Sequence, residues 1–100
     1  MSTVVNYSEK QVDTAQLAKA LSHPARVFIM QKLSKMNSCC YSGDIAEELN
    51  MGRSALSLHL KELKHAGLIN GTNESPYIKY CINRENWAIA KQLFKDLFEE

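Results

Sequence analysis

The sequence predicts a mainly α-helical domain that carries one small β-hairpin. Apolar residues recur at intervals of three or four over four segments that end at Gly67, and again over one segment after Asn83. Between these segments the pattern changes to two short strands, "LINGT" and "YIKYCIN", around a turn in "NESP". We therefore expect the element order α-α-α-α-β-β-α in a single domain that spans residues 1–100.

The first two helices begin at recognisable signals. Ser8 and Gln11 form the S-x-x-Q pattern of a capping box ahead of a helix at about residues 9–21. In "SHPARVFIMQKLSK", Ser22 is a candidate N-cap and Pro24 falls in the first turn, where its missing N–H costs nothing. The second helix is expected to be largely buried. Its apolar stripe consists of Val27, Met30 and Leu33, widened by Phe28 and Ile29.

The third and fourth helices are expected in "SGDIAEELN" and "RSALSLHLKELKHAG", joined by a tight turn at "NMG". Ser42 is a candidate cap of the third helix, and Gly67 stands where a helix C-terminus favours glycine. The preceding "NSCCY" is expected to be a loop or a very short strand. The core face of the fourth helix carries Leu56, Leu60 and Leu63.

The last helix follows the hairpin and is capped by Asn83. Its apolar stripe contains Trp87, Ala90, Phe94 and Leu97, which is wider than a single hairpin can cover. Two short helices joined by a tight turn and followed directly by a hairpin describe a winged helix-turn-helix.

Composition narrows the class of protein. The net charge of the chain is only +1. Segment 53–65, however, contains three basic residues, Arg53, Lys61 and Lys64, and a single acidic residue, a distribution that is compatible with a DNA-binding helix. No apolar run is long enough to span a membrane, and residues 1–10 do not resemble a secretory signal. Three cysteines, an odd number, argue against a secreted disulfide scaffold, so we expect a reducing cytoplasm. No arrangement of catalytic residues appears at a usable spacing, so an enzyme is not expected.

Three segments together resemble the ArsR-type family of small winged-helix repressors. They are "LAKALSHPARVFIMQKL", "DIAEELNMGRSALSLHLKELKHAGLI" and "YIKYCIN", and the resemblance covers about residues 17–83. Pro24-x-Arg26, Ser57-x-His59-Leu60 and Ala66-Gly67-Leu68 fall in register with the family pattern. The resemblance implies a cytoplasmic, homodimeric repressor whose first and last helices, about residues 9–21 and 84–99, form the dimer interface.

The resemblance also implies how DNA is read. The fourth helix, residues 53–66, is expected to enter the major groove by its N-terminal half, so that Arg53 can contact guanine. Leu58 departs from the basic or polar residue common in the family, and Gly52 replaces the usual hydroxyl cap. The expected DNA-contacting residues are Arg53 and Leu58 for bases, Ser54 and Ser57 for bases or phosphates, His59, Lys61 and Lys64 for phosphates, and Asn73 and Lys79 in the wing.

Family members commonly respond to a metal ion, arsenite or a sulfur oxidant, which draws attention to Cys39, Cys40 and Cys81. The family's C-x-C motif is absent, because residues 41–43 occupy its place, and the last helix has no histidine for a zinc site. A disulfide between the adjacent pair is disfavoured, since neighbouring Cα atoms are ~3.8 Å apart, which is short of the usual disulfide range of ~4.4–6.8 Å.

Two outcomes remain open for the cysteines. If the segment before the third helix pairs beside the wing, Cys39 or Cys40 can approach Cys81, which allows a disulfide or a three-thiolate site for arsenite or a soft metal ion. Otherwise the cysteines are small apolar residues, and no cofactor is required for the fold.

Three functions therefore remain in view. The first is a dimeric DNA-binding repressor released by a thiol-reactive effector. The second is a DNA-binding regulator without sensing, and the third is a winged-helix protein-interaction module. A steep loss of DNA binding with salt distinguishes the first two from the third.

Overall fold

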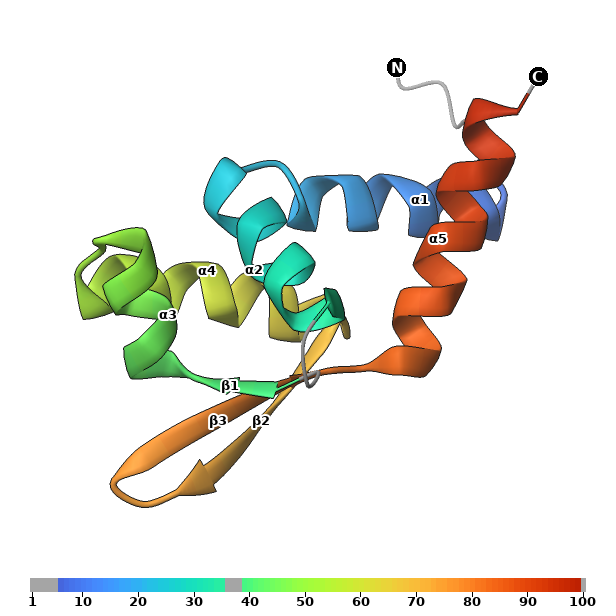
Figure 1. Cartoon of the computed structure of the whole chain (residues 1–100). Helices are drawn as coiled ribbons and strands as arrows, with labels where there is room; N and C mark the ends of the chain where they lie inside the picture. The colour runs from blue at the N-terminus through green and yellow to red at the C-terminus, as the bar shows by residue number, and fades with distance from the viewer. Residues whose placement is uncertain (1–5, 36–38, 100) are drawn as a thin grey trace.

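The computed structural model describes residues 6–35 and 39–99. Within them, helices surround one side of a small sheet from which a long hairpin projects (Figure 1). The elements are α1 (Glu9–Ala20), α2 (Pro24–Lys35), β1 (Cys39–Tyr41), α3 (Ser42–Leu49), α4 (Arg53–His65), β2 (Ile69–Glu74), β3 (Tyr77–Ile82) and α5 (Arg84–Phe98). The expected helices and hairpin are confirmed, and the order gains a strand, β1, between α2 and α3.

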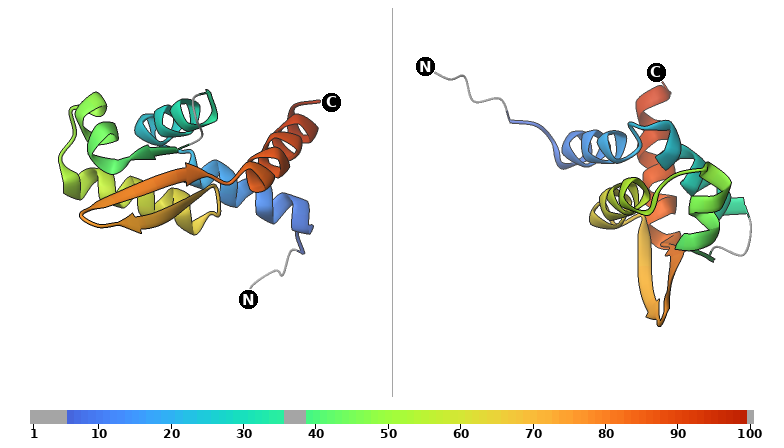
Figure 2. Two further views of the ribbon diagram at one scale, coloured as in Figure 1. Left: turned by 60° about the horizontal axis from the view of Figure 1, so that its bottom comes forward. Right: turned by 90° about the vertical axis from the view of Figure 1, so that its left-hand side faces the viewer.

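The sheet is antiparallel with strand order β1-β3-β2. The hairpin of β2 and β3 extends beyond the helices, and Figure 2 shows its tip standing clear of them. The short β1 pairs only with the inner part of β3, where Cys39 lies opposite Cys81 and Tyr41 opposite Lys79. The segment that leads into α3 is therefore hydrogen-bonded to the base of the wing.

The core lies between α2, α3, α4 and the inner end of the hairpin. Burial of each large apolar side chain contributes about 1.5–3 kcal/mol relative to exposure. The largest fully buried side chains are Ile29, Met30, Leu33, Ile45, Leu60, Leu63, Leu68 and Ile69. The stripe predicted for α2 is wrong at Val27, which stays 41% exposed, because α2 packs on α4 and β3 through the face that carries Ile29 and Leu33.

Three of the predicted helix ends are confirmed. The Gln11 N–H donates to Ser8 Oγ at 3.1 Å, and the Ser8 N–H donates to Gln11 Oε1 at 2.9 Å, which completes the capping box. The Asn86 N–H donates to Asn83 Oδ1 at 3.0 Å at the start of α5. Gly67 takes φ +80° directly after α4, the left-handed conformation that ends helices most easily at glycine.

Two predicted caps are wrong. The α2 N-terminus is capped by His23, whose Nδ1 accepts the Ala25 N–H at 3.0 Å, while Ser22 Oγ turns back to α1. Ser42 is the first residue of α3 rather than its cap, because β1 continues to Tyr41 and leaves that residue at the N-cap position without a side-chain hydrogen bond. Pairing with β3 thus sets where α3 begins.

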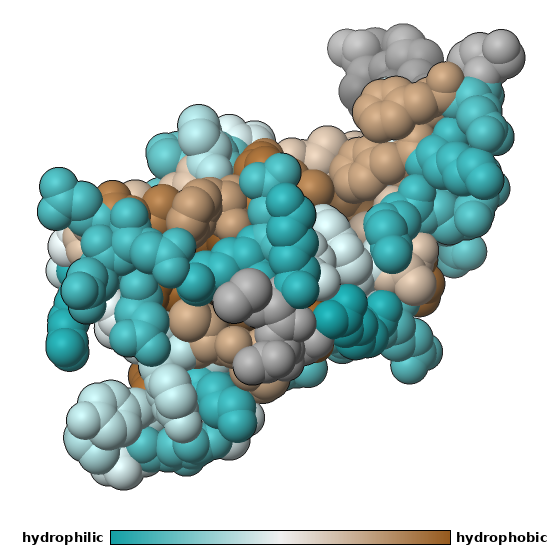
Figure 3. All heavy atoms as spheres, in the orientation of Figure 1, coloured by the Kyte–Doolittle hydropathy of each residue, from teal (hydrophilic) through white to brown (hydrophobic). Residues whose placement is uncertain are grey.

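α1 and α5 pack against each other at the end of the molecule opposite the wing (Figure 1). On α1, Val12, Ala15 and Ala18 recur every three residues and remain exposed. On α5, Leu97 is 53% and Phe98 is 76% exposed, and Figure 3 shows apolar side chains along this end of the molecule. Within the described residues, no helix is both long and apolar enough to cross a membrane.

Candidate nucleic-acid interface

α4 presents one face to the core and the opposite face to solvent. It follows α3 after a short turn in which Asn50 adopts the left-handed conformation, at φ 49°. The two helices and the turn form the helix-turn-helix that the sequence predicted. The core face carries Leu56, His59, Leu60 and Leu63, and the exposed face carries Arg53, Ser54, Ser57, Leu58, Lys61 and Lys64.

The N-terminus of α4 lies beside the wing. Arg53 and Ser57 line a hollow of about 180 Å³ together with Ser42 of α3 and with Ile78 and Tyr80 of β3. The start of α3, the start of α4 and the wing therefore share one surface. A guanidinium and hydroxyls collected on such a surface can donate hydrogen bonds to phosphates or to base edges.

Gly52 caps α4 without a side-chain hydrogen bond, as the sequence predicted. Because glycine has no side-chain oxygen, it leaves the first-turn N–H groups of α4 without a capping acceptor of its own. N–H groups at a helix N-terminus favour anions, and a phosphate is a suitable acceptor for them. This end of the helix can therefore accept the DNA backbone.

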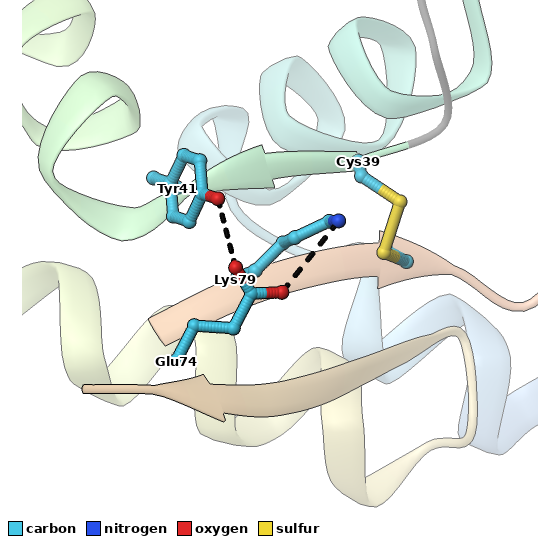
Figure 4. Close-up of a disulfide and its surroundings, with 5 residues drawn as sticks. Cys39, Tyr41, Glu74 and Lys79 are labelled. Atoms are coloured by element: carbon cyan, nitrogen blue, oxygen red, sulfur yellow. Dashed lines mark hydrogen bonds and ion pairs between the residues drawn. A yellow bond between two sulfur atoms is a disulfide. The ribbon is translucent and has the colours of Figure 1, made fainter. Parts of the chain in front are cut away.

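The wing carries less free positive charge than the sequence suggested. Lys79 Nζ lies 3.6 Å from Glu74 Oε2, and the Tyr41 hydroxyl donates to Glu74 Oε1 at 2.9 Å (Figure 4). The acceptor Glu74 raises the pKa of the Tyr41 hydroxyl, first through this hydrogen bond and then through its charge. Glu74 thus offsets Lys79, whereas Asn73 is exposed at the end of β2.

His59 is the clearest correction to the expected site. Its residue is only 8% exposed, Nδ1 accepts a hydrogen bond from Arg26 Nε at 3.0 Å, and its ring centroid lies 4.3 Å from that of His23. The side chain faces α2, so the expectation that it contacts phosphates is wrong. A signal was present in the sequence, because Leu56, His59, Leu60 and Leu63 follow the i, i+3, i+4, i+7 spacing of one helix face.

Burial lowers the pKa of the His59 imidazole, and the charges of His23 and Arg26 lower it further. The ring is therefore held neutral, with its Nδ1 lone pair directed at the guanidinium. In the sequence, Arg26 stands out only as part of the family resemblance, and no pattern marks His23. Arg26 and His59 are 33 residues apart in the sequence, so no local sequence pattern predicts their contact.

The two adjacent cysteines have different surroundings. Cys39 and Cys81 form a disulfide between β1 and β3, with Cα atoms 4.0 Å apart (Figure 4). Cys40 has a free thiol on the other face of β1, packed against the core, and burial raises its pKa. Of the two outcomes that the sequence left open for the cysteines, the structure has the approach of Cys39 to Cys81.

The three-thiolate site is not supported, because strand alternation turns Cys40 away from the other two sulfur atoms. Over residues 6–35 and 39–99, no group of three or more His, Cys, Asp or Glu side chains is arranged to hold a metal ion. Arsenite or a soft metal ion therefore lacks the expected ligand set in this part of the chain.

The helix pair, the wing and the surrounding helices define a winged helix-turn-helix protein. Residues 23–71 match the family model described as bacterial regulatory protein, arsR family. An uncharacterised HTH-type transcriptional regulator of Methanocaldococcus jannaschii is 31% identical over 94 residues, which cover 90% of this chain and 97% of that protein. The chain therefore belongs to the ArsR family of bacterial regulatory proteins.

The HTH-type transcriptional regulator CmtR of Mycobacterium tuberculosis is 35% identical over 76 residues, which cover 76% of this chain. The matched part spans only 63% of the length of CmtR. Among solved structures, a homodimeric winged helix-turn-helix DNA-binding domain of a possible ArsR-family regulator from Mycobacterium bovis superposes with a TM-score of 0.69. It is 25% identical, and the match covers 100% of this chain and 94% of that one.

Proposed function

We propose that this chain is a homodimeric, DNA-binding transcriptional repressor that reads an inverted-repeat operator through α4. One observation carries the proposal: the exposed face of the second helix of the helix-turn-helix bears Arg53, Ser57 and Lys61, while its opposite face is buried in the core. The buried face fixes the helix on the body of the protein, so the exposed face can meet DNA as a rigid surface.

The chemistry of that face divides between recognition and affinity. Arg53 can fork onto O6 and N7 of a guanine in the major groove, and the 57% exposed Leu58 can contact a thymine methyl group. Lys61 and Lys64 lie further along the exposed face, where ammonium groups suit phosphates. The wing would flank the site with Asn73, and with Lys79 only when its ion pair with Glu74 opens.

The dimer would form through α1 and α5. A groove of about 430 Å³ between these helices is lined mainly by apolar atoms, including those of Ala15, Ala18, Leu93 and Leu97. Exposed apolar surface of this kind marks an interaction site, and a second copy of the chain offers a matching apolar face by symmetry. A two-fold axis there would set the two α4 helices about one DNA turn, ~34 Å, apart.

The test is a selection of bound sequences from random duplex DNA, followed by gel shifts at about 50 and 200 mM salt. We expect an inverted repeat, a steep loss of affinity with salt, and strong weakening by Arg53→Ala. Lys91→Ala, an exposed lysine on α5, is the matched control and should bind like the wild type. If DNA binding is weak, does not depend on salt and is unchanged by Arg53→Ala, the result would favour a winged-helix protein-interaction module over a DNA-binding repressor.

A second part of the proposal concerns the effector, and the Cys39–Cys81 disulfide favours an oxidant over a metal ion. β1 leads directly into α3, so bonding β1 to β3 ties the start of the helix-turn-helix to the wing. Cys39 lines a surface hollow of about 360 Å³ with Asp44 and Lys79, through which a small oxidant can reach its sulfur.

Hydrogen peroxide is the simplest oxidant of the required class. One thiolate would attack a peroxide oxygen, so that an S–O bond forms, the O–O bond breaks and one water leaves after protonation. The second thiol then attacks that sulfur, the S–S bond forms, and the S–O bond breaks with loss of a second water. Two thiols lose two electrons, and one peroxide is reduced to two waters.

A further inference from the structure

Three side chains meet beneath α4 and form what is here called the His–Arg cluster: His23, Arg26 and His59. Arg26 Nε donates to His59 Nδ1 at 3.0 Å, and the rings of His23 and His59 lie 4.3 Å apart, inclined by 41°. His23 caps the N-terminus of α2, Arg26 lies in the first turn of α2, and His59 lies in the middle of α4. The cluster is therefore a polar contact between two helices that otherwise pack through apolar side chains.

The α2 side of the cluster is fixed by backbone hydrogen bonds. His23 Nδ1 accepts the Ala25 N–H at 3.0 Å, which holds the ring over the helix start. The Arg26 N–H donates to the His23 carbonyl oxygen at 2.9 Å, so both side chains leave the same turn. The His23 ring and the Arg26 side chain are therefore fixed at the start of α2. The contact of His59 with them determines where α4 packs on α2.

The hydrogen bond from Arg26 to His59 Nδ1 can form only when the His59 imidazole is neutral. The Nδ1 lone pair receives the N–H of a permanently charged guanidinium, so an imidazolium would place an N–H against an N–H. His23 adds a second titratable group on the α2 side, and both neighbours disfavour positive charge on His59. On α4 itself, Glu62 lines a different groove with Gln16, Lys19 and His65.

We propose that His59 is a positioning residue for DNA recognition, and that the His–Arg cluster holds α4 in its reading orientation until His59 takes up a proton. This proposal rests on the proposed function of α4 as the recognition helix. Arg26 and His59 lie on the two sides of the contact, so a proton on His59 separates α4 from α2 at the middle of the reading helix. DNA affinity should therefore fall in acid.

The expected size follows from population arithmetic. If only the neutral form holds α4 in the orientation that binds DNA, affinity falls about tenfold per protomer for each pH unit below the pKa of His59, and therefore about a hundredfold for a dimer that reads DNA with both α4 helices. Because that pKa lies below the ordinary value of 6.5, affinity is full at pH 7.5 and decreases in the range below 6.5. Stability also falls in that range, because the His59 imidazole of the unfolded chain takes up a proton at a higher pH than that of the folded chain.

The decisive variant is His59→Asn, in which the amide oxygen can accept from Arg26 and cannot titrate. His65→Asn, at the exposed end of the same helix, is the matched control. We expect the wild type and His65→Asn to lose affinity in parallel from pH 7.5 to pH 5, while His59→Asn binds like the wild type at pH 7.5 and loses much less. Parallel profiles for His59→Asn and the wild type would overturn the proposal.

Two measurements without DNA keep this test separate from the proposed function. An NMR titration of the wild-type chain should show His59 titrating below the ordinary value of 6.5, and Arg26→Gln should raise the His59 pKa by removing the guanidinium. The urea midpoint of the wild type should fall below pH 6.5 more steeply than that of His59→Asn. If His59 does not titrate below the ordinary value of 6.5, the inference fails even when DNA binds. If it titrates lower but no DNA binds at any pH, the proposed function fails, and the role of His59 in DNA recognition fails with it.

Discussion

Single residues set the end of α4, and Gly67 shows why. Any residue that replaces Gly67 must keep its backbone φ of +80°. The added Cβ atom would lie 3.0 Å from Asn86 Nδ2, and the Asn86 side-chain N–H donates to the Gly67 carbonyl oxygen at 2.8 Å. We expect Gly67→Ala to lower the free energy of unfolding by about 1–2 kcal/mol, because L residues pay this cost for the left-handed conformation. Urea unfolding at pH 7.5 measures it.

Gly43 supplies the control for this substitution. It lies in the first turn of α3, and a Cβ there would meet no atom within 4 Å. Gly43→Ala should raise the free energy of unfolding by about 0.5–1 kcal/mol, since alanine loses less backbone freedom in a helix. If Gly67→Ala unfolded no more easily than Gly43→Ala, the left-handed turn would not be the feature that ends α4.

The cysteines give a second prediction at the residue scale. The chain has three cysteines and the disulfide uses two, so the oxidised protein should show one titratable thiol after denaturation and the reduced protein three. We expect peroxide to change DNA binding by the wild type, because the Cys39–Cys81 disulfide ties the start of α3 to the wing, and to leave Cys39→Ser unaffected. Gel shifts before and after dithiothreitol treatment measure this.

Cys40→Ser is the matched control, because it removes the adjacent thiol and keeps the Cys39–Cys81 pair. It should still respond to peroxide, although loss of a core-facing group lowers its stability. A Cys40→Ser variant that no longer responds, or a Cys39→Ser variant that still does, would remove the disulfide from the proposed switch.

At the scale of elements, local sequence patterns predicted the helices, because hydrogen bonds and packing between residues close in the sequence determine them. The i, i+3, i+4 spacing of apolar residues identified all five helices of the described chain, and the capping box at Ser8 marked the start of α1. For β1 the sequence predicts either a loop or a short strand, because three residues have little intrinsic preference and the hydrogen bonds of β1 come from β3, some 40 residues away. Nonlocal pairing also moved the start of α3 to Ser42.

For the candidate site, too, the sequence predicted the features that depend on one helix and missed the contact that depends on two. The exposed face of α4 followed from its periodicity, since Arg53, Ser57 and Lys61 oppose Leu56 and Leu63 on the helix. The role of His59 did not follow, because a histidine suits either a phosphate or a partner in the interior. The partner, Arg26, lies on another helix, so the contact depends on how α2 and α4 pack.

Within α4, two variants should separate recognition from affinity. Arg53→Ala should cost about 1–3 kcal/mol of binding and relax the preference at one base pair, if the guanidinium forks onto guanine. Lys64→Ala should weaken binding to all sequences alike and reduce the salt slope by about 1, because a phosphate contact carries no sequence information. Binding to a panel of single-base variants of the selected site measures both.

Equal effects of both substitutions on every sequence would show that Arg53 contacts the backbone. The selected site would then owe its sequence to Leu58, Ser54 or Ser57, or to the shape of the DNA. The exposed Leu58 is the next residue to test, since Leu58→Ala should act only where a thymine methyl group is present.

For the whole molecule, the distribution of charge matters more than its sum. A net charge of +1 gives little long-range attraction for DNA. The cationic side chains of α4 are exposed on one surface, whereas Lys79 of the wing is paired with Glu74. A single copy therefore presents few phosphate contacts, and tight binding requires two copies on one operator.

The last prediction tests this requirement. Leu97, 53% exposed in the groove between α1 and α5, would contact the second copy, and Leu97→Glu would place a carboxylate against an apolar face. We expect a monomer by light scattering, operator affinity at least tenfold weaker, and a salt slope near half that of the wild type, because half the phosphate contacts are lost. Val27→Glu, a similarly exposed apolar site on α2, should remain a dimer with the full slope. A Leu97→Glu protein that is dimeric and keeps the full slope would place the interface elsewhere than the groove.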